Sequence, residues 1–245
     1  MLEGRATIVY GPVQSRRLGI SLGVNLIPAR SKLCSFDCPY CECGRNTPKA
    51  DRSRWPSPDE VAQSLRRALG RLERSPDHIT LSGSGEPTLH PRFPVVVERL
   101  SEVRAELAPL TRTAILSNGA AAGQETTRAA LLRLDVRMLK LDPGPSERVN
   151  GVPVDARRLS DEYRALKPYT LQGMVAQGAD WDGSSEASLA AWLRVLVRAD
   201  PDAVHLYSIA RPAADAAVRG VPRERLEEMA KAVRRALPRS VVQVF

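Results

Sequence analysis

Short apolar runs alternate with amphipathic stretches along almost the whole chain. The runs are rich in aliphatic and β-branched residues, which is typical of strands buried on both faces. In the stretches between them, apolar residues recur every three to four positions, which predicts helices. The predicted strands are 18–27, 78–81, 113–117, 136–141, 169–176, 203–209 and 241–244. The predicted helices are 57–72, 93–107, 124–132, 155–166, 186–197 and 223–237.

This order of elements indicates the fold class. Strands that alternate with helices through short connections favour a parallel sheet covered by helices. About six strand–helix units are too few to close the standard (β/α)8 barrel. We therefore expect an α/β fold, a partial (β/α)6 barrel with a parallel sheet. No stretch resembles a long linker, so we expect a single domain over residues 1–245.

A loop with closely spaced cysteines follows the first predicted strand. Cys34, Cys38 and Cys41 have the spacing Cys-x3-Cys-x2-Cys, and Tyr40 precedes the third cysteine. Three thiolates in one loop suit a [4Fe–4S] cluster, whose irons are held by cysteine sulfur. Three protein ligands on four irons leave one iron open, and an open iron can bind and activate a second molecule.

Other interpretations of the loop need to be weighed. The three cysteines would share one face of an ideal helix, but Pro39 opposes a helix because an internal proline costs about 3 kcal/mol. Zinc bound by these three and Cys43 is another alternative. All four cysteines lie within ten residues, which leaves no spacer for a second zinc knuckle. Disulfides are the third alternative, and nothing in the sequence suggests secretion. We favour the iron–sulfur cluster.

Composition bounds the class of protein. The chain has 245 residues, 43% of them hydrophobic, which is enough for a substantial core. The net charge of +8 favours a polyanionic partner such as nucleic acid. Many arginines lie on predicted helices, however, and such faces are usually only solvated. Aromatic residues make up 4% of the chain, too few for an obvious base-stacking platform.

The sequence also bears on location. The start of the chain has no long apolar core, and no apolar run approaches the roughly 18 residues of a membrane span. We therefore expect a cytoplasmic protein without a membrane partner, in a compartment where thiols stay reduced.

Polar residues gather after the predicted strands. In parallel α/β folds the working residues lie at the carboxyl ends of strands. Each group alone is ordinary turn chemistry, so the shared placement is the stronger signal. The groups are the cysteine loop, 82–87, 117–119, Lys140 with Asp142, Gln172, Gln177, and Tyr207 with Arg211.

Taken together, these motifs resemble the radical S-adenosylmethionine (SAM) superfamily. The cysteine loop has that superfamily's spacing, and Tyr40 holds its customary aromatic position. Gly85-Glu86-Pro87 is similar to its Gly-Gly-Glu-Pro element, with Ser84 in place of a glycine. Segments 11–19 and 82–90 resemble a subgroup of Fe–S oxidoreductases related to the wybutosine tRNA-modifying enzymes. The Gly-x-Ile-x-Gly adenine-contact pattern is not found.

The resemblance implies a mechanism. Cys34, Cys38 and Cys41 would bind a [4Fe–4S] cluster, whose open iron would chelate SAM through its amine and carboxylate. One electron, from an external flavodoxin- or ferredoxin-like donor, would cleave SAM to methionine and a 5′-deoxyadenosyl radical. That radical would abstract hydrogen from the substrate. Cys43 would block the open iron if it were a ligand, so we predict that it is not one.

The resemblance also implies SAM contacts. Ser84, Gly85, Glu86 and Pro87 would offer backbone acceptors to the methionyl ammonium; the alternative is a tight turn before a helix. Tyr40 would pack near the adenine or simply fill the core.

Further contacts are expected at the next two strands. Ser117 and Asn118 would hydrogen-bond the methionyl carboxylate or ribose, or form a polar turn. Lys140 and Asp142 alternate onto one face of their strand, where they would meet SAM or pair with each other. Weaker candidates for the substrate side are Gln172, Tyr207, Arg211 and His90. Arg16 and Arg17, before the first predicted strand, would hold an anionic group or be structural.

The substrate stays open at this level: tRNA, a protein or a small molecule. A tRNA-modifying role fits the basic charge, although no added RNA-binding domain is visible. An activase that installs a glycyl radical on a protein partner is one alternative. A non-catalytic iron–sulfur or zinc module, in which the loop only staples the fold, is another.

Overall fold

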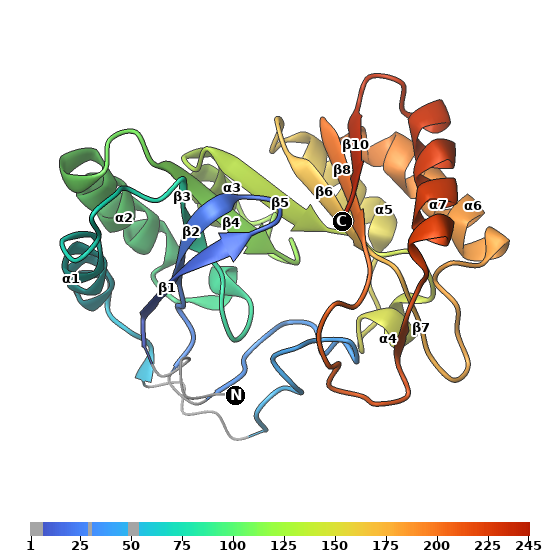
Figure 1. Ribbon diagram of the computed structural model, residues 1–245, viewed down its shortest axis with the longest axis horizontal. Helices are drawn as coiled ribbons and strands as arrows, with labels where there is room; N and C mark the ends of the chain where they lie inside the picture. Colours follow the sequence, from blue (N-terminus) through green and yellow to red (C-terminus); the bar gives the residue numbers. More distant parts are fainter. Residues whose placement is uncertain (1–6, 29–30, 49–53) are drawn as a thin grey trace. The chain divides into compact units, whose positions relative to one another are not determined.

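The computed structural model describes residues 7–28, 31–48 and 54–245 (Figure 1). The chain forms two compact units, each assembled from several segments. The first unit comprises Met1–Ser35, Asn46–Ser117 and Gly123–Arg137. The second unit comprises Phe36–Arg45, Asn118–Ala122 and Met138–Phe245.

The first unit contains strands in the order β1-β2-β3-β4. β2, β3 and β4 are mutually parallel, as the sequence predicts, while β1 is antiparallel to β2. The prediction missed β1 because most of its side chains are exposed, so it has no apolar run. Arg16 and Arg17 consequently lie in the turn between two strands and not before the first one. The strands are β1 (Val9–Ser15), β2 (Gly19–Val24), β3 (His78–Leu81) and β4 (Arg112–Ser117).

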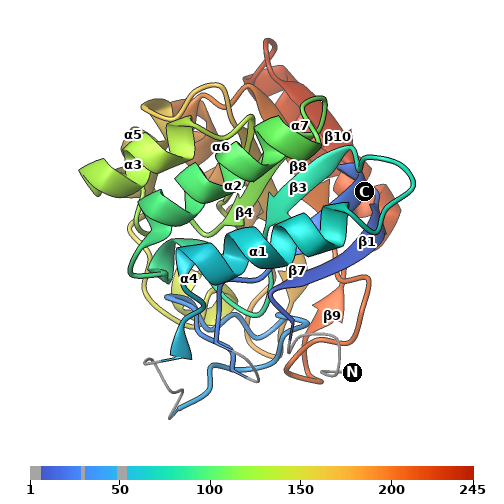
Figure 2. The same ribbon diagram turned by 90° about the vertical axis from the view of Figure 1, so that its left-hand side faces the viewer.

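Helices of the first unit pack beside one another. α1 contacts α2 and α2 contacts α3, and Figure 2 shows the three in front of β3 and β4. The start of α1 follows from local sequence: Ser57 Oγ accepts from Glu60 N, and Ser57 N donates to Glu60 Oε2. This capping box stabilises the helix by about 1 kcal/mol. The helices are α1 (Pro58–Leu69), η3 (Pro87–Leu89), α2 (Phe93–Leu107) and α3 (Glu125–Leu132).

The second unit has the strand order β5-β6-β8-β10, and each neighbouring pair is parallel. β5 begins in the last residues of the first unit. A separate ribbon pairs β7 with β9 in antiparallel fashion, which the sequence prediction missed because each strand is so short. The strands are β5 (Val136–Lys140), β6 (Thr170–Met174), β7 (Ala176–Gln177), β8 (Ala203–Tyr207), β9 (Arg219–Gly220) and β10 (Val241–Val244).

Helices of the second unit form a row in which α5 contacts α6 and α6 contacts α7. α7 also contacts β8 and β10, beside which it lies in Figure 1. The apolar residues at the centres of the strands are fully buried, as Leu171, Val204 and Leu206 show. Burial of each such side chain contributes about 1.5–3 kcal/mol. The helices are α4 (Ser146–Val149), α5 (Ala156–Arg164), α6 (Glu186–Ala199) and α7 (Arg223–Ala236).

The expected fold class is confirmed: the fold is α/β with a mostly parallel sheet. Within the described residues, β1 pairs only with β2 and β10 only with β8, so no closed barrel forms. A helix of the length and apolarity needed to span a membrane is absent from the described part of the chain. Because β3 and β4 are parallel, their last residues, Leu81 and Ser117, lie at one edge of the first unit's sheet.

Candidate functional site

The Gly-Glu-Pro element of the first unit lies against the residue that precedes Cys34. Leu33 N donates to Ser84 O over 3.2 Å, and Glu86 N donates to Leu33 O over 2.9 Å. A Cβ on Gly85 would lie 1.7 Å from Leu33 O. Only glycine therefore permits this approach of the two backbones. The element thus fixes the chain at the start of the cysteine loop.

Asn46 holds the backbone of Cys34 from the other end of the loop. Cys34 N donates to Asn46 Oδ1 over 3.0 Å, and Asn46 Nδ2 donates to Cys34 O over 3.1 Å. Thr47 N also donates to Lys32 O over 2.9 Å. The sequence analysis gave Asn46 no role, so its part in positioning Cys34 was missed.

A buried carboxylate joins two of the predicted SAM-contact residues. Glu86 is 3% exposed, and its Oε1 accepts hydrogen bonds from Thr88 N, Thr88 Oγ1 and Ser117 Oγ. The Ser117 Oγ–Glu86 Oε1 distance is 2.8 Å. The first unit therefore brings Glu86 and Ser117 together, with the Ser117 hydroxyl donating to the carboxylate.

The backbone acceptors expected in this element already have internal partners. Ser84 O accepts from Leu33 N, Glu86 O from Leu89 N and Pro87 O from His90 N. Each carbonyl oxygen has two lone pairs and can accept two hydrogen bonds. Binding of a methionyl ammonium by these carbonyls stays a prediction.

His90 has a structural position. Its Nε2 lies 2.8 Å from Pro56 O, and its Nδ1 accepts from Arg92 N. Burial lowers the pKa of His90, which favours the neutral ring that this pairing needs. Both ring nitrogens contact backbone, which leaves neither for a substrate.

In the second unit, Asp142 is the centre of a buried polar cluster. Its side chain is 0% exposed, and Lys140 Nζ lies 2.7 Å from its Oδ2. Tyr40 Oη and Asn150 Nδ2 donate to the same oxygen, and Met174 N donates to Oδ1. The ammonium of Lys140 also lies 4.4 Å from the centroid of the Tyr40 ring. Lys140 and Asp142 thus form an ion pair with each other, and a contact of either with SAM stays a prediction.

The charges of this cluster depend on one another. Burial alone would lower the pKa of Lys140, but the adjacent Asp142 carboxylate outweighs it and holds that pKa above its ordinary value. Burial, together with the same carboxylate, raises the pKa of Tyr40 well above its usual range. Tyr40 therefore stays protonated and donates to Asp142, which fixes the position of its ring beside Cys38 and Cys41.

None of the four cysteines, all of which the structure describes, is in a disulfide bond. Cys41 N donates to Cys38 O in a turn, and Asn150 Nδ2 lies 3.8 Å from Cys38 Sγ. Burial raises the pKa of the Cys38 thiol, while Lys140 opposes that effect. Within the described residues, no group of three or more His, Cys, Asp or Glu is assembled for a metal ion.

The division of the chain passes through this loop. Cys34 belongs to the first unit, and Cys38 and Cys41 belong to the second. Three cysteine sulfurs from one loop are nevertheless the donor set that an iron–sulfur cluster takes. Ligation by these cysteines, and the exclusion of Cys43, stay predictions.

The remaining predicted residues are spread over the second unit. Tyr163 Oη lies 2.9 Å from both Asn118 O and Lys140 O, and Asn118 Oδ1 accepts from Ala120 N in a polar turn. Gln172 is buried, with Nε2 3.4 Å from Met138 Sδ. The structure thus brings Asn118 near Lys140 through the hydroxyl of Tyr163.

Two further candidates for the substrate side lie in β8 and the loop after it. Arg211 forms an exposed ion pair with Glu42, at 2.9 Å. Tyr207 is the last residue of β8 and is half-buried. A role of either residue toward a substrate stays a prediction.

Asn150 was missed by the sequence analysis. It follows α4 and lies in an Asn-Gly dipeptide, which is a turn signal. That signal could have marked the position as a loop, but not its contacts with Cys38 and Asp142. Those contacts join residues far apart in the sequence.

Comparisons with known proteins bear on the family of this chain. Residues 30–139 match the family model of the Radical SAM superfamily. A UPF0026 protein of Methanocaldococcus jannaschii is 37% identical over 138 residues, which are 56% of this chain and 40% of that protein. The chain thus spans less than half of that relative's length. A UPF0026 protein of Synechocystis sp. is 31% identical over 214 residues, covering 83% of this chain and 76% of that protein.

A solved structure bears on the fold. The crystal structure of Streptococcus suis SuiB bound to S-adenosylmethionine has a TM-score of 0.63 and 14% sequence identity. The match covers 91% of this chain and 50% of SuiB. At that identity the likeness shows the fold alone, and the wybutosine-like subgroup is not confirmed. The family match and the coverage of the Synechocystis relative lead to one conclusion: the chain belongs to the UPF0026 protein family and carries a radical SAM superfamily domain.

Proposed function

We propose that the protein is a radical SAM enzyme that uses a [4Fe–4S] cluster held by Cys34, Cys38 and Cys41. The observation that carries the proposal is the Cys-x3-Cys-x2-Cys spacing of three cysteines that form no disulfide, inside the matched residues 30–139. When bound, the cluster would supply the electron that cleaves SAM to methionine and a 5′-deoxyadenosyl radical. That radical would abstract hydrogen from the substrate.

The surroundings of the cysteines support this role. In the first unit, Asn46 and Leu33 hold the backbone at Cys34 through the hydrogen bonds described above. In the second unit, Asn150 donates toward the sulfur of Cys38. A metal site gains affinity when outer contacts hold its ligands in place. The residues of this chain would therefore orient two of the thiolates before the cluster binds.

Residues around Asp142 support the binding of SAM. The hydroxyl of Tyr40 is fixed by Asp142, and its ring contacts the Lys140 ammonium, so the ring has one orientation to offer an adenine. The Lys140 side chain is 15% exposed, and its ammonium would donate a hydrogen bond to the carboxylate or ribose of SAM. In the first unit, Ser84, Gly85, Glu86 and Pro87 would offer their backbone to the methionyl ammonium.

The partners follow from the chemistry. The reaction needs an external one-electron donor of flavodoxin or ferredoxin type. The net charge of +8 supports a polyanionic substrate such as tRNA, with a protein or a small molecule as the other substrate classes. A cytoplasmic location is part of the same proposal, because reduced thiols are needed to bind the cluster.

The test is anaerobic reconstitution with iron and sulfide, reduction with dithionite, addition of SAM and chromatography for 5′-deoxyadenosine. We expect iron uptake and product in the native chain and in Cys43→Ala, and loss of both in Cys38→Ala. A bound cluster that gives no 5′-deoxyadenosine, and whose electron paramagnetic resonance spectrum does not change with SAM, would overturn the proposal. Equal loss in the two cysteine variants would overturn the assigned ligands.

A further inference from the structure

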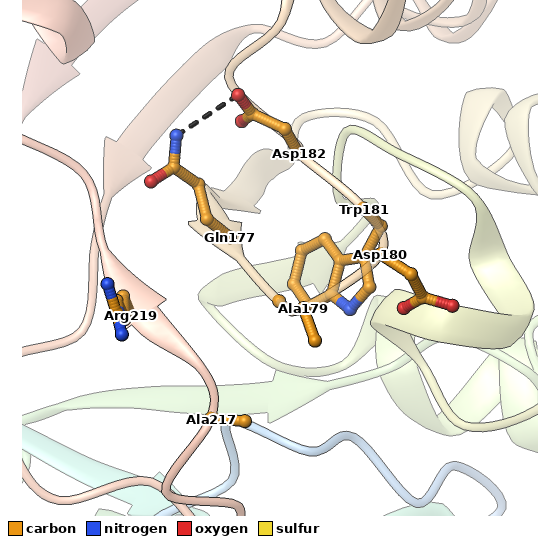
Figure 3. A pocket seen from close by; sticks show the side chains of 8 residues that line it. Gln177, Ala179, Asp180, Trp181, Asp182, Ala217 and Arg219 are labelled. Atoms are coloured by element: carbon orange, nitrogen blue, oxygen red, sulfur yellow. Dashed lines mark hydrogen bonds between the residues drawn. The ribbon is translucent and has the colours of Figure 1, made fainter.

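The second unit contains a pocket of about 670 Å³ that none of the roles above uses (Figure 3). We call it the Arg219 pocket; its walls include Gln177, Trp181, Asp182 and Arg219. Pockets that bind small molecules usually have volumes of about 300–1,000 Å³. The Arg219 pocket is therefore large enough for a ligand the size of a nucleotide.

Arg219 supplies a cation to this pocket. It lies opposite Gln177 in the β7–β9 ribbon, so the two side chains share one face of the ribbon, and Figure 3 shows both beside the pocket. Arg219 is exposed and has no ion pair with any residue that the structure describes. Two neighbouring arginines are paired: Arg148 Nη2 lies 2.8 Å from Asp180 Oδ2, and Arg225 Nη2 lies 2.7 Å from Glu186 Oε1. The Arg219 guanidinium can thus bind an anionic ligand without breaking an ion pair to a described residue.

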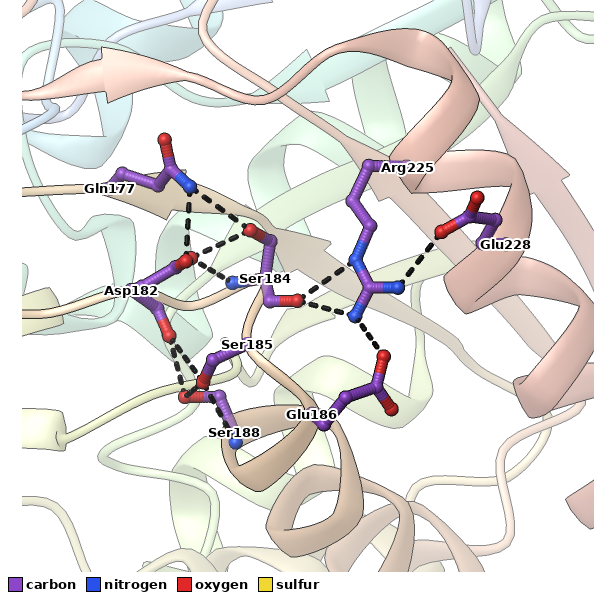
Figure 4. A network of polar contacts seen from close by, with 8 residues as sticks. All are labelled: Gln177, Asp182, Ser184, Ser185, Glu186, Ser188, Arg225 and Glu228. Atoms are coloured by element: carbon purple, nitrogen blue, oxygen red, sulfur yellow. Dashed lines mark hydrogen bonds and ion pairs between the residues drawn. The ribbon is translucent and has the colours of Figure 1, made fainter.

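A hydrogen-bond network fixes the wall that carries Gln177 (Figure 4). Asp182 Oδ1 accepts from Ser184 N at 2.7 Å and Ser184 Oγ at 2.6 Å, and Asp182 Oδ2 accepts from Gln177 Nε2 at 3.0 Å. Burial alone would raise the pKa of Asp182, but these hydrogen bonds outweigh it and lower that pKa. Arg225 Nη2 in turn donates to Ser184 O at 2.6 Å. The amide of Gln177 is therefore oriented, with Nε2 committed to the wall and Oε1 available as an acceptor.

Trp181 gives the pocket an aromatic surface. A Cβ on Gly178 would lie 2.0 Å from Trp181 Nε1, so the indole packs directly against the glycine. Gly178 N donates to Trp181 O at 2.9 Å, which closes the loop between the two residues. A half-buried indole held in this way can stack with a flat ring such as a nucleic-acid base.

A second, smaller pocket joins this one to the cysteine loop. We call it the Pro39 pocket; its volume is about 230 Å³, and it shares Trp181 and Ala217 with the Arg219 pocket. Its walls also include Pro39 and Arg45, which belong to the cysteine loop. Pro39 lies between Cys38 and Tyr40 in the sequence. A ligand seated on Trp181 can therefore extend toward the predicted cluster ligands within one unit.

We propose that the Arg219 pocket binds a nucleotide, with its phosphate on Arg219 and its base on Trp181. The planar guanidinium fork fits two phosphate oxygens. An amino group on the base edge would donate to Gln177 Oε1. The two carboxylates beside the pocket are already engaged, Asp180 by Arg148 and Asp182 by its network, and the chain as a whole is basic. A role of this nucleotide as the substrate, or as part of it, rests on the proposed function. The binding of the nucleotide does not rest on that function.

Calorimetric titration of the reconstituted full chain tests the proposal. The probes are the four ribonucleoside 5′-monophosphates and the matching nucleosides, each with SAM at saturation so that a SAM site is already filled. We expect at least one monophosphate to bind about tenfold or more tightly than its nucleoside, because only the former makes a charge-assisted contact with Arg219. Arg219→Ala should remove that difference, and Arg219→Lys should keep part of it.

The matched control is Arg157→Ala. Arg157 lies on α5, is exposed, and lines neither pocket. This variant should bind as the native chain does. Trp181→Leu should weaken the monophosphate and the nucleoside alike, because both would lose the stacked ring. Circular dichroism of each variant shows whether it is folded. If Arg219→Ala is not folded, the affinity of Arg219→Lys and the quenching of Trp181 fluorescence by the probes test the pocket in its place.

Several results would overturn the proposal: equal binding of nucleotide and nucleoside, no binding of any monophosphate, or the same loss in Arg157→Ala as in Arg219→Ala. Binding of an acidic peptide through Arg219, with no binding of nucleotides, would also overturn the proposal. Binding of a short single-stranded RNA that depends on Arg219 and Trp181 would indicate that the ligand is a nucleotide within an RNA chain. Binding of monophosphates but not of this RNA would indicate a free nucleotide. Formation of 5′-deoxyadenosine is assayed separately, so failure of this proposal is distinguishable from failure of the enzyme assignment.

Discussion

Asn150 donates a hydrogen bond toward the sulfur of Cys38, with Nδ2 3.8 Å from Sγ. The same amide donates to Asp142 Oδ2 at 3.2 Å, and Asn150 O accepts from Asp37 N at 2.8 Å. One asparagine thus contacts the cysteine loop through its side chain and its backbone. Hydrogen bonds to cluster sulfurs raise the reduction potential of iron–sulfur clusters, because they stabilise the more negative, reduced state.

Asn150→Ala should therefore lower the reduction potential of the reconstituted cluster. A hydrogen bond of about 0.5–1.5 kcal/mol corresponds to roughly 20–60 mV for one electron. The measurement is a redox titration followed by electron paramagnetic resonance. Gln172→Ala is the matched control, since its buried amide faces the sulfur of Met138 and not that of a cysteine. An unchanged potential in Asn150→Ala would show that this contact does not act on the cluster.

Asp142→Ala should strongly destabilise the second unit. The change leaves the buried Lys140 ammonium without its partner, and removal of one member of a buried ion pair costs about 3–5 kcal/mol. Replacement of both residues, as in Lys140→Met with Asp142→Leu, should restore part of the loss. The free energy of unfolding in urea measures both effects. Asp161→Ala, which removes one side of the exposed pair with Arg198, should change stability far less.

Gly85→Ala should prevent the cysteine loop from docking on the Gly-Glu-Pro element. The added Cβ would lie 1.7 Å from the carbonyl oxygen of Leu33, and backbone cannot move aside as a flexible side chain can. We expect a lower free energy of unfolding and a loss of bound iron after reconstitution. Gly70→Ala is the control, because its Cβ would meet only Arg66 O, at 3.3 Å. Full iron content in Gly85→Ala would contradict the proposal that the contact between Gly85 and Leu33 positions Cys34 for the cluster.

Asp135 should contribute to the acid stability of the first unit. Burial alone would raise its pKa, but hydrogen bonds from Thr113 N and Oγ1 outweigh burial and hold the pKa of Asp135 below its usual range. The contribution is therefore complete above the unfolded pKa of about 3.9 and disappears as the pH falls through the lower, folded value.

Melting temperatures measured from pH 7 to pH 2 test this dependence. Asp135→Asn should melt at a lower temperature near neutral pH, and its difference from the native chain should shrink as the pH falls through that window. Glu125→Gln removes an exposed carboxylate on α3 and should follow the native curve. A difference in melting temperature that stays constant down to pH 2 would contradict the assignment to ionised Asp135.

Features that depend on neighbouring residues could be predicted from the sequence. The predicted helix 93–107 and strands 78–81 and 241–244 have the observed bounds, because apolar periodicity and turn residues are local signals. The Cys-x3-Cys-x2-Cys spacing indicated the superfamily for the same reason. β1 was missed since its exposed side chains give no apolar pattern.

Which polar groups contact one another could not be predicted from the sequence, because it depends on the packing of distant segments. The sequence left open whether Lys140 and Asp142 pair with each other; in the structure they do, with the carboxylate 0% exposed, while a contact with SAM stays a prediction. Cys38 and Asn150 are 112 positions apart, and no local pattern encodes a hydrogen bond between such residues. Their contact arises because the cysteine loop and the turn after α4 pack together within the second unit. Sequence periodicity reports which side chains are buried, but their buried partners are set by packing.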